Sequence, residues 1–129
     1  MKKDLSNIKK AKYLLDNNHC VAIPTETVYG LAANAYSDKA TSKIFKLKKR
    51  PKSNPLIVHY SRVQDLRKDC EINSNFQKLY SKFCPGPLTF VLKLKKESKI
   101  SKNVTNGKNT LAVRFPKNLI TRNLLTYLR

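Results

Sequence analysis

Glycine, tryptophan and acidic residues are scarce in this chain of 129 residues. It contains three glycines and no tryptophan, and its glycines do not form a phosphate-binding loop of the Walker or dinucleotide type. The three cysteines, Cys20, Cys70 and Cys84, lack a C-x-x-C spacing, which argues against a disulfide framework and against a zinc site. No Ser/His/Asp elbow or metal-ligand cluster is evident either. Any nucleotide would therefore be held by side-chain cations and isolated amides.

Two of these absences bear on location. No apolar run approaches the roughly 20 residues that a membrane-spanning helix needs. An odd number of unpaired cysteines is typical of reduced, buried thiols in an intracellular protein. We therefore expect a cytoplasmic protein without a membrane span.

The shortage of acidic residues leaves a large net positive charge. Twenty-seven Lys and Arg residues oppose eight Asp and Glu, which gives a formal net charge of +19. A surface of this kind attracts polyanions such as RNA, and nucleotides, by its long-range field and by counterion release. A biased codon composition, which enriches Lys, Asn and Ile together, explains the charge equally well. Both explanations stay open at the level of sequence.

Short apolar or β-branched runs alternate along the chain with segments whose apolar residues recur at helical spacing. The predicted strands cover residues 20–23, 31–35, 56–60, 88–94 and 111–115. The predicted helices cover residues 5–15, 38 to at most 50, 61–66, 76–83 and 119–128, and residues 95–109 are expected to form an exposed loop. Ser37 or Asp38 would cap the second helix and Ser61 the third. This order predicts one α/β or α+β domain around a single sheet over residues 1–129.

A polar block follows the first strand, Pro-Thr-Glu-Thr-Val-Tyr-Gly-Leu at residues 24–31. An extended loop after the proline would expose the hydroxyls of Thr25 and Thr27 and the Glu26 carboxylate, while Gly30 permits a tight turn. Threonine is also an ordinary strand residue. Taken alone, the block is therefore compatible with a structural role.

A second block, Lys-Lys-Arg-Pro-Lys-Ser-Asn-Pro-Leu-Ile-Val-His, occupies residues 48–59. Lys48 and Arg50 stand at the end of a helix, which Pro51 prevents from continuing. On extended backbone, their spacing of two would point both cations the same way, toward phosphate oxygens. Alternatively, the run is a solvated face that is favourable at a helix C-terminus. Asn54, held extended by the proline that follows it, could hydrogen-bond a base or ribose.

Three further polar residues accompany the predicted strands. His59, near the end of its strand, could meet a ligand carboxylate or make a purely structural hydrogen bond. Thr110 and Arg114 are four residues apart on a strand pattern and therefore share a face. The Arg114 guanidinium would be costly to bury without an anionic partner. A substrate carboxylate, Glu26 and a contact near the C-terminus are the alternatives for that partner.

These blocks resemble the YrdC-like domain of threonylcarbamoyl-adenylate synthases. The matching stretches are residues 24–31 and 48–59, Pro-Gly-Pro-Leu-Thr at residues 85–89, and Leu-Ala-Val-Arg-Phe-Pro at residues 111–116. They occur in the order found in the family, and the resemblance extends from about residue 5 to the end of the chain. It implies an α/β fold with a twisted, open, mixed sheet, flanking helices and a large basic concave face.

The resemblance also implies an activity, that of a nucleotidyltransferase. Such an enzyme condenses L-threonine, bicarbonate and ATP, with Mg²⁺, into threonylcarbamoyl-AMP and pyrophosphate. A downstream threonylcarbamoyl-transferase complex then forms threonylcarbamoyladenosine (t6A) in tRNA. The residues implied to contact L-threonine are Thr27, His59 and Arg114, the last at the carboxylate. The residues implied to contact ATP are Lys48, Arg50, Asn54 and Thr110. Lys48 and Arg50 are the implied catalytic pair, because this transfer needs positioning and charge neutralisation more than a strong base.

The chain departs from the family pattern at three places. Cys84 replaces the tryptophan that usually precedes Pro-Gly-Pro, and Asn118 stands where a histidine is common. The chain also ends before the family's Ser-x-Asn motif and before the last strands of the sheet. We therefore expect Leu124, Leu125 and Leu128 to pack against a segment that this chain lacks. Two alternatives to an active synthase follow: a non-catalytic module that binds tRNA or double-stranded RNA, and an inactive, truncated remnant.

Overall fold

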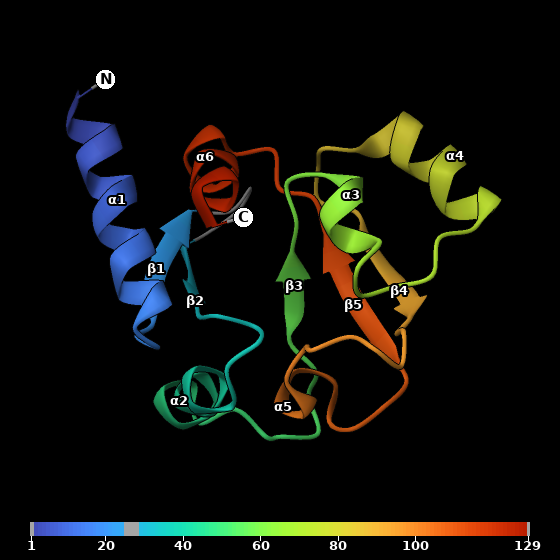
Figure 1. The fold of residues 1–129 in the computed structure, drawn as a ribbon, viewed down its shortest axis with the longest axis horizontal. Coiled ribbons are helices and arrows are strands. Elements are labelled where there is room, and N and C mark those ends of the chain that lie inside the picture. The colour runs from blue at the N-terminus through green and yellow to red at the C-terminus, as the bar shows by residue number, and fades with distance from the viewer. Residues whose placement is uncertain (1, 25–28, 129) are drawn as a thin grey trace.

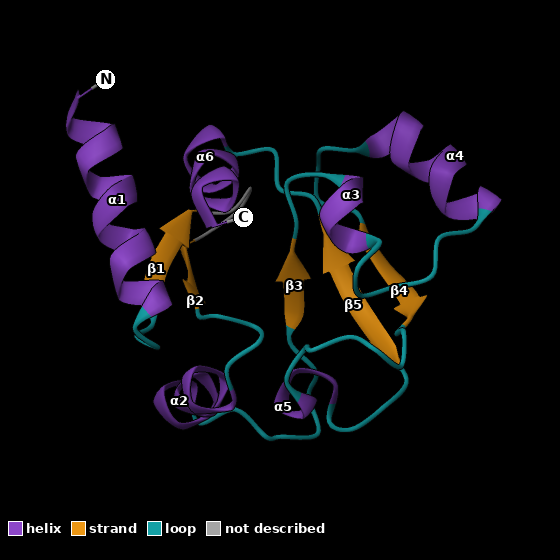
Figure 2. Ribbon diagram, in the orientation of Figure 1, coloured by secondary structure: helices purple, strands orange, loops and turns teal. Residues whose placement is uncertain are grey.

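The computed structural model describes residues 2–24 and 29–128, in which helices and strands interleave along the chain (Figures 1 and 2). In chain order, the elements are α1 (Lys2–Asp16), β1 (Val21–Pro24), β2 (Tyr29–Ala32), α2 (Asp38–Lys48), β3 (Ile57–His59), α3 (Val63–Leu66), α4 (Ser74–Phe83), β4 (Thr89–Lys93), α5 (Lys102–Thr105), β5 (Thr110–Arg114) and α6 (Leu119–Leu128). The predicted α/β class with flanking helices is confirmed. The helix α5 was not expected, because residues 95–109 were predicted to be loop throughout. Within the described residues, the helices are too short or too polar to cross a bilayer.

The strands form two small sheets, whereas the sequence pattern predicted one. β1 and β2 pair antiparallel, with Val21 opposite Ala32 and Pro24 opposite Tyr29. In the second sheet β5 is central, parallel to β3 and antiparallel to β4. Figure 1 shows β2 and β3 standing apart, and no described ladder joins them. The periodicity of a strand reveals its faces but not its neighbours, which is why the division into two sheets was missed.

The larger hydrophobic core lies on one face of the β3–β5–β4 sheet. Alternation along the strands places four apolar side chains on this face, and all are buried: Phe90, Leu92, Leu111 and Val113. The helices and loops that cover them add Leu66, Phe76, Ile100 and Val104. The polar members of the same strands consequently point to the opposite face of the sheet.

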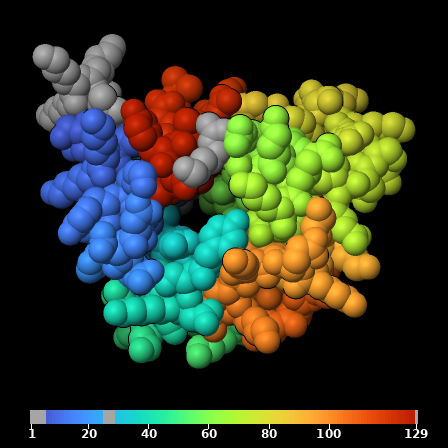
Figure 3. Space-filling view, viewed as in Figure 1, coloured from blue at the N-terminus to red at the C-terminus, as the bar shows by residue number. Residues whose placement is uncertain are grey.

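The helices α1 and α6 and the β1–β2 hairpin enclose a second, smaller core. Ile8, Leu15, Ile23 and Leu124 are each at most 8% exposed and pack together, with Leu128 against them. Figures 1 and 3 show α1 and α6 side by side at one end of the molecule. The expectation that Leu124 and Leu128 pack against a segment that this chain lacks is therefore wrong, whereas Leu125 is half-buried and is not a member of this core. The last helix returns to the first, a long-range contact that local periodicity does not report.

Side-chain caps set where several of the helices begin, α2 and α4 among them. The Ser37 hydroxyl accepts a hydrogen bond from the Ala40 N–H and starts α2, as predicted. The Asn73 side chain does the same for α4. The prediction that Ser61 caps α3 is wrong, because Arg62 occupies the N-cap position and makes no side-chain capping bond. The Ser37 cap fixes where α2 begins, and this also determines the position of its last turn and of the cations there.

Candidate functional site

The uncovered face of the three-stranded sheet aligns one polar residue from each strand. In the β3–β5 ladder His59 is opposite Arg114, and in the β4–β5 ladder Thr89 is opposite the same Arg114. All three are half-buried. Directly opposite residues of paired strands are cross-strand neighbours, with Cβ atoms about 5 Å apart. His59, Arg114 and Thr89 therefore form a short line across the sheet, called here the polar row.

The guanidinium of Arg114 is held by the hydroxyl of Thr89. Its Nε donates to Thr89 Oγ1 at 3.1 Å and its Nη2 donates to the same oxygen at 2.6 Å. No carboxylate of the described side chains forms an ion pair with Arg114. Glu26, one of the partners considered from sequence, lies outside the described residues. Within the described part of the chain, the Arg114 guanidinium is oriented by the neutral Thr89 hydroxyl and not by a carboxylate. Its positive charge is therefore available to a bound anion.

The rest of this face is first apolar and then polar again. Ile57, Ala112 and Val91 follow the polar row across the three strands, and Thr110 is opposite Lys93 beyond them. The prediction that Thr110 and Arg114 share a face is confirmed by this ladder. Four residues of strand separate them by about 13 Å. Thr110 and the polar row therefore mark two ends of one surface.

The cations of the second block are arranged differently from the prediction. Lys48 is the last residue of α2, and Lys49 then adopts a left-handed conformation with a φ of 49°. The backbone between Lys48 and Arg50 is thus not extended, and the expectation that spacing alone aligns their side chains is wrong. The left-handed cap turns the chain out of the helix axis.

Arg50 folds the following loop back on itself. Its Nε donates to the Asn54 carbonyl oxygen at 3.2 Å and its Nη2 to the Pro55 carbonyl oxygen at 2.7 Å. The Asn54 N–H donates in turn to the Pro51 carbonyl oxygen at 3.0 Å. The side chain of Asn54 is exposed. The structure therefore brings Arg50 and Asn54 together in one loop, while Lys48 stays at the exposed end of α2.

A cavity of about 900 Å³ separates the β1–β2 hairpin from β3. Its polar lining includes Arg50, His59, Ser61 and Asp69. Its apolar lining comes from both sheets and from α6, and includes Ile23, Leu31, Ile57, Leu124, Leu125 and Leu128. Arg50 and His59, two of the predicted site residues, thus line this cavity. A cavity with a polar part and an apolar part is typical of ligand-binding sites.

One wall of this cavity is fixed by a buried carboxylate. Asp69 is 2% exposed and accepts hydrogen bonds from Tyr36 Oη at 2.6 Å, Tyr60 Oη at 2.7 Å and Ser98 Oγ at 2.7 Å. Burial, and then the contact with Asp69, raise the pKa of Tyr60 above its ordinary value, so its phenol stays protonated and donates. Asp69 thus joins its own segment to three others, which stabilises the shape of the wall.

Over residues 2–24 and 29–128, the thiols and the acidic groups do not gather into a metal-binding cluster. All three cysteines are free, and burial raises the pKa of Cys70 to about 12. Within the described residues, no group of three or more His, Cys, Asp or Glu side chains could hold a metal ion.

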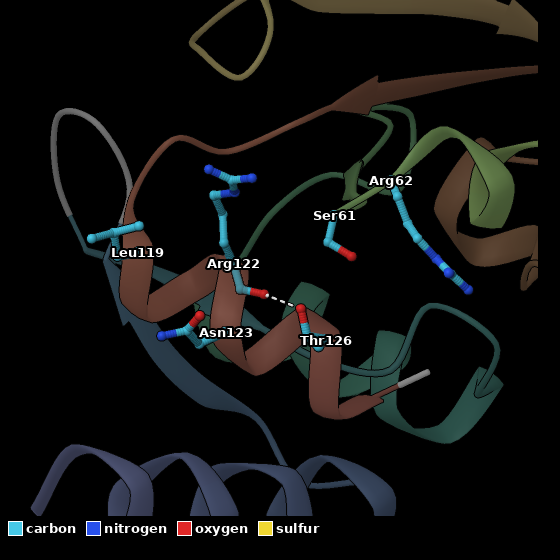
Figure 4. Close-up of a pocket in the computed structure, with 6 residues that line it drawn as sticks. All are labelled: Ser61, Arg62, Leu119, Arg122, Asn123 and Thr126. Carbon is cyan, nitrogen blue, oxygen red and sulfur yellow. Dashed lines mark hydrogen bonds between the residues drawn. The ribbon is translucent and has the colours of Figure 1, made fainter. Parts of the chain in front are cut away.

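A smaller hollow of about 280 Å³ lies between α6 and the start of α3 (Figure 4). It is lined by Ser61, Arg62, Leu119, Arg122, Asn123 and Thr126. In Figure 4 the side chains of Arg62 and Arg122 point away from each other. Arg62 is also paired with Asp65 at 3.0 Å. The two cations do not converge on a common ligand, so this hollow is not the candidate site.

Sequence reasoning missed two residues of the site, and one residue that it assigned to L-threonine is not tested by the structure. Thr89 stands in the Pro-Gly-Pro-Leu-Thr stretch, but only the strand register places it beside Arg114. Asp69 lies in a polar run without periodicity, and no sequence signal distinguishes it. Thr27 lies outside the described residues.

Comparison with known proteins points to one family. A family model described as "Sua5_yciO_yrdC: Telomere recombination" matches residues 13–129. A threonylcarbamoyl-AMP synthase of Pyrococcus abyssi is 40% identical over 119 residues, which are 92% of this chain and 34% of the relative. One of Bacillus subtilis is 44% identical over 112 residues, which are 84% of this chain and 32% of the relative. The chain spans about a third of the length of these relatives.

The fold is similar to that of solved structures. The structure of P. abyssi Sua5 complexed with L-threonine is 39% identical and has a TM-score of 0.87, covering 92% of this chain and 35% of that chain. E. coli YciO, at 22% identity, has a TM-score of 0.83 over 95% of this chain and 59% of that chain, and supports the fold alone.

Proposed function

The chain belongs to the Sua5/YciO/YrdC family, and from this membership we propose that it binds L-threonine and ATP to form threonylcarbamoyl-AMP. Its relatives are named threonylcarbamoyl-AMP synthases. Because the chain spans about a third of those relatives, the complete reaction, its substrates and its partners are part of the proposal.

The polar row is the observation that carries the assignment of L-threonine. Arg114 is a fixed cation on an open sheet face, oriented by Thr89 and flanked by His59. A guanidinium pairs with a carboxylate through two parallel hydrogen bonds, which selects both charge and geometry. A relative with this fold is known with L-threonine bound. We assign the amino-acid carboxylate to Arg114, with His59 and Thr27 as further contacts.

ATP is assigned to the other end of the same surface. Lys46 and Lys48 give the last turn of α2 a positive charge, and Arg50 lies two residues beyond Lys48. Asn54 and Thr110 add polar groups for the nucleoside. In this proposal Mg²⁺ belongs to the substrate and enters as MgATP. Lys48 and Arg50 would neutralise charge on the phosphates during the transfer.

The proposed reaction balances without a strong base in the protein. Bicarbonate takes up the ammonium proton of threonine and yields CO₂ and water, and the free amine then adds to CO₂ and forms a carbamate as one proton leaves to the solvent. A carbamate oxygen attacks the α-phosphorus of ATP and pyrophosphate leaves, which gives threonylcarbamoyl-AMP. A separate transferase complex would pass the threonylcarbamoyl group to tRNA in the cytoplasm. The protein contributes binding, alignment and charge neutralisation, which suit the residues of this face.

Pyrophosphate release tests the proposal. The purified 129-residue protein is incubated with MgATP, L-threonine and bicarbonate, and we expect release that requires all three. Omission of bicarbonate or replacement of L-threonine by D-threonine provides matched controls. L-Threonine binding is measured in parallel by calorimetry. Release at background together with binding of L-threonine would restrict the function to binding, and loss of both would overturn the proposal.

The net charge of +19 favours a second candidate, an RNA-binding role. Such binding is expected to weaken steeply with salt, by about 10³-fold or more between 50 and 200 mM for six or more phosphate contacts. It should also survive replacement of Arg114, which sits within a small-ligand site. Titration of a tRNA at several salt concentrations measures both properties. Binding that is insensitive to salt would exclude this role.

A further inference from the structure

One hydrogen bond joins the last helix to the start of the polar block at residues 24–31. The hydroxyl of Thr121, in the first turn of α6, donates to the Pro24 carbonyl oxygen at 2.5 Å, across 97 positions of sequence. Thr121 is 1% exposed, and Pro24 is the last residue of β1. The polar block therefore leaves β1 at a point that α6 holds.

This bond differs from that of Thr41, a helical threonine that is equally buried. Thr41 donates its hydroxyl to the Ser37 carbonyl oxygen at 2.8 Å, four residues earlier in the chain. A carbonyl at that spacing is the ordinary partner of a threonine within a helix. Thr121 stands nearer the start of its helix, and Lys117, four residues earlier, precedes α6. The Thr121 hydroxyl instead connects two distant parts of the chain.

Asn118 determines where Thr121 stands in α6. Its side-chain Oδ1 accepts hydrogen bonds from the N–H groups of Ile120 and Thr121, at 3.0 and 3.3 Å, directly before the helix. These are the bonds of an N-cap, which fixes the first helical turn. Asn118, which replaces the histidine common in the family, thus has a structural role in this chain.

The Pro24 carbonyl is a point from which the course of the polar block can be controlled. The peptide unit between Pro24 and the next residue is planar, so an anchored oxygen also fixes the orientation of that unit. At the other end, Tyr29 is opposite Pro24 in the β1–β2 ladder. The hairpin lines the large cavity through Ile23 and Leu31, and His59 lines the same cavity from β3. The anchor therefore also sets the position of one cavity wall.

We propose that Thr121 is a positioning residue for L-threonine, which anchors the Pro24 carbonyl and thereby orders the polar block for the ligand. This inference rests on the proposed function, in which Thr27, three positions after Pro24 in the sequence, contacts L-threonine. Thr121 acts through the block and not by touching the ligand. Without the anchor, the conformational entropy lost on ordering the block would offset part of the binding free energy of L-threonine.

Replacement of Thr121 separates this role from a general effect on stability. Thr121→Val keeps the shape and removes the hydroxyl, and should weaken L-threonine binding about three- to tenfold, which corresponds to the net free energy of one hydrogen bond. Thr121→Ser keeps the hydroxyl and should bind nearly as the original chain does. Thr41→Val removes an equally buried hydroxyl from α2 and is the matched control. It should lower the midpoint of urea unfolding and leave the calorimetric affinity for L-threonine unchanged.

An NMR signal reports the anchor without any ligand. Pro24 and Thr25 form the only Pro-Thr pair in the sequence. Protein labelled with ¹³C at proline carbonyls and with ¹⁵N in threonine therefore gives one signal that correlates the two labels. A carbonyl carbon resonates at lower field when its oxygen accepts a hydrogen bond. The carbon shift should move to higher field in Thr121→Val and should stay near its original value in Thr121→Ser and Thr41→Val.

The outcomes of the proposed function and of this inference are distinct. If the original chain does not bind L-threonine, the proposed function fails, and the carbonyl signal still judges the anchor. An unchanged carbonyl signal in a folded Thr121→Val would overturn the anchor. Equal L-threonine binding by the original chain and Thr121→Val, or an equal loss of affinity in Thr41→Val, would overturn the positioning role.

A second variant covers a failure to fold. If Thr121→Val does not fold, Thr121→Ala removes the hydroxyl with a smaller side chain and is judged by the same two measurements. If neither variant folds while Thr121→Ser does, the hydroxyl is needed for folding as a whole. That result would overturn the positioning role as well.

Discussion

Replacing Arg114 with glutamine is expected to weaken L-threonine binding about a hundredfold or more. Glutamine keeps a polar side chain but removes the charge and the planar fork, which together hold a carboxylate through charge-assisted bonds. The loss corresponds to about 3 kcal/mol of binding free energy. Calorimetric titration with L-threonine measures it, and thermal unfolding followed by circular dichroism checks that the variant is folded.

Two companion variants sharpen this result. Arg114→Lys keeps the charge without the fork and should fall between the original chain and Arg114→Gln, because lysine acts as a point charge. Arg122→Gln makes the same change in the smaller hollow of Figure 4, where the cations do not converge, and should bind L-threonine as the original chain does. Unchanged affinity in a folded Arg114→Gln would show that the polar row is not the carboxylate site.

Replacing Phe115 with alanine is expected to destabilise the protein by about 3–5 kcal/mol. Phe115 is 2% exposed, and its ring centroid lies 4.9 Å from that of Tyr80, 6.2 Å from that of Phe76 and 6.4 Å from that of Phe90. Alanine would leave a cavity at the centre of this aromatic cluster. Domains of this size are stable by about 5–15 kcal/mol. The variant should therefore lose a large part of its stability.

Urea unfolding followed by circular dichroism measures this change. Phe115→Leu, which keeps much of the volume, should cost clearly less. Val91→Ala removes apolar volume from a side chain that is 68% exposed and should change the free energy of unfolding by less than about 0.5 kcal/mol. Equal midpoints for Phe115→Ala and Val91→Ala would contradict the assignment of this core. The same measurement on the original chain tests the alternative of an inactive remnant. A remnant with an incomplete core would not unfold cooperatively, so a cooperative transition would argue against it.

Most helices and strands were predictable because their signals are local. Apolar periodicity located α1, α4 and α6, and β-rich runs located the strands within a few residues. Ser37 was recognised as a cap because a serine side chain can satisfy the first free N–H groups of a helix. The short α5 was missed, because one turn of helix leaves no periodic pattern.

The candidate site was predictable in part. The family motifs named Lys48, Arg50, Asn54, His59, Thr110 and Arg114. Alternation alone placed Thr110 and Arg114 on one face. The arrangement around Lys48 was not predictable, since the left-handed Lys49 depends on how α2 ends.

By itself, the sequence determined the α/β class, the family and the residue types available for an amino acid and a nucleotide. Only the tertiary structure decided that His59 and Thr89 stand on either side of Arg114, that α6 returns to α1, and that a cavity divides two sheets. The physical reason is the same in each case. Strand register and helix docking depend on contacts between residues distant in the chain, whereas side-chain alternation and helix caps depend only on neighbours.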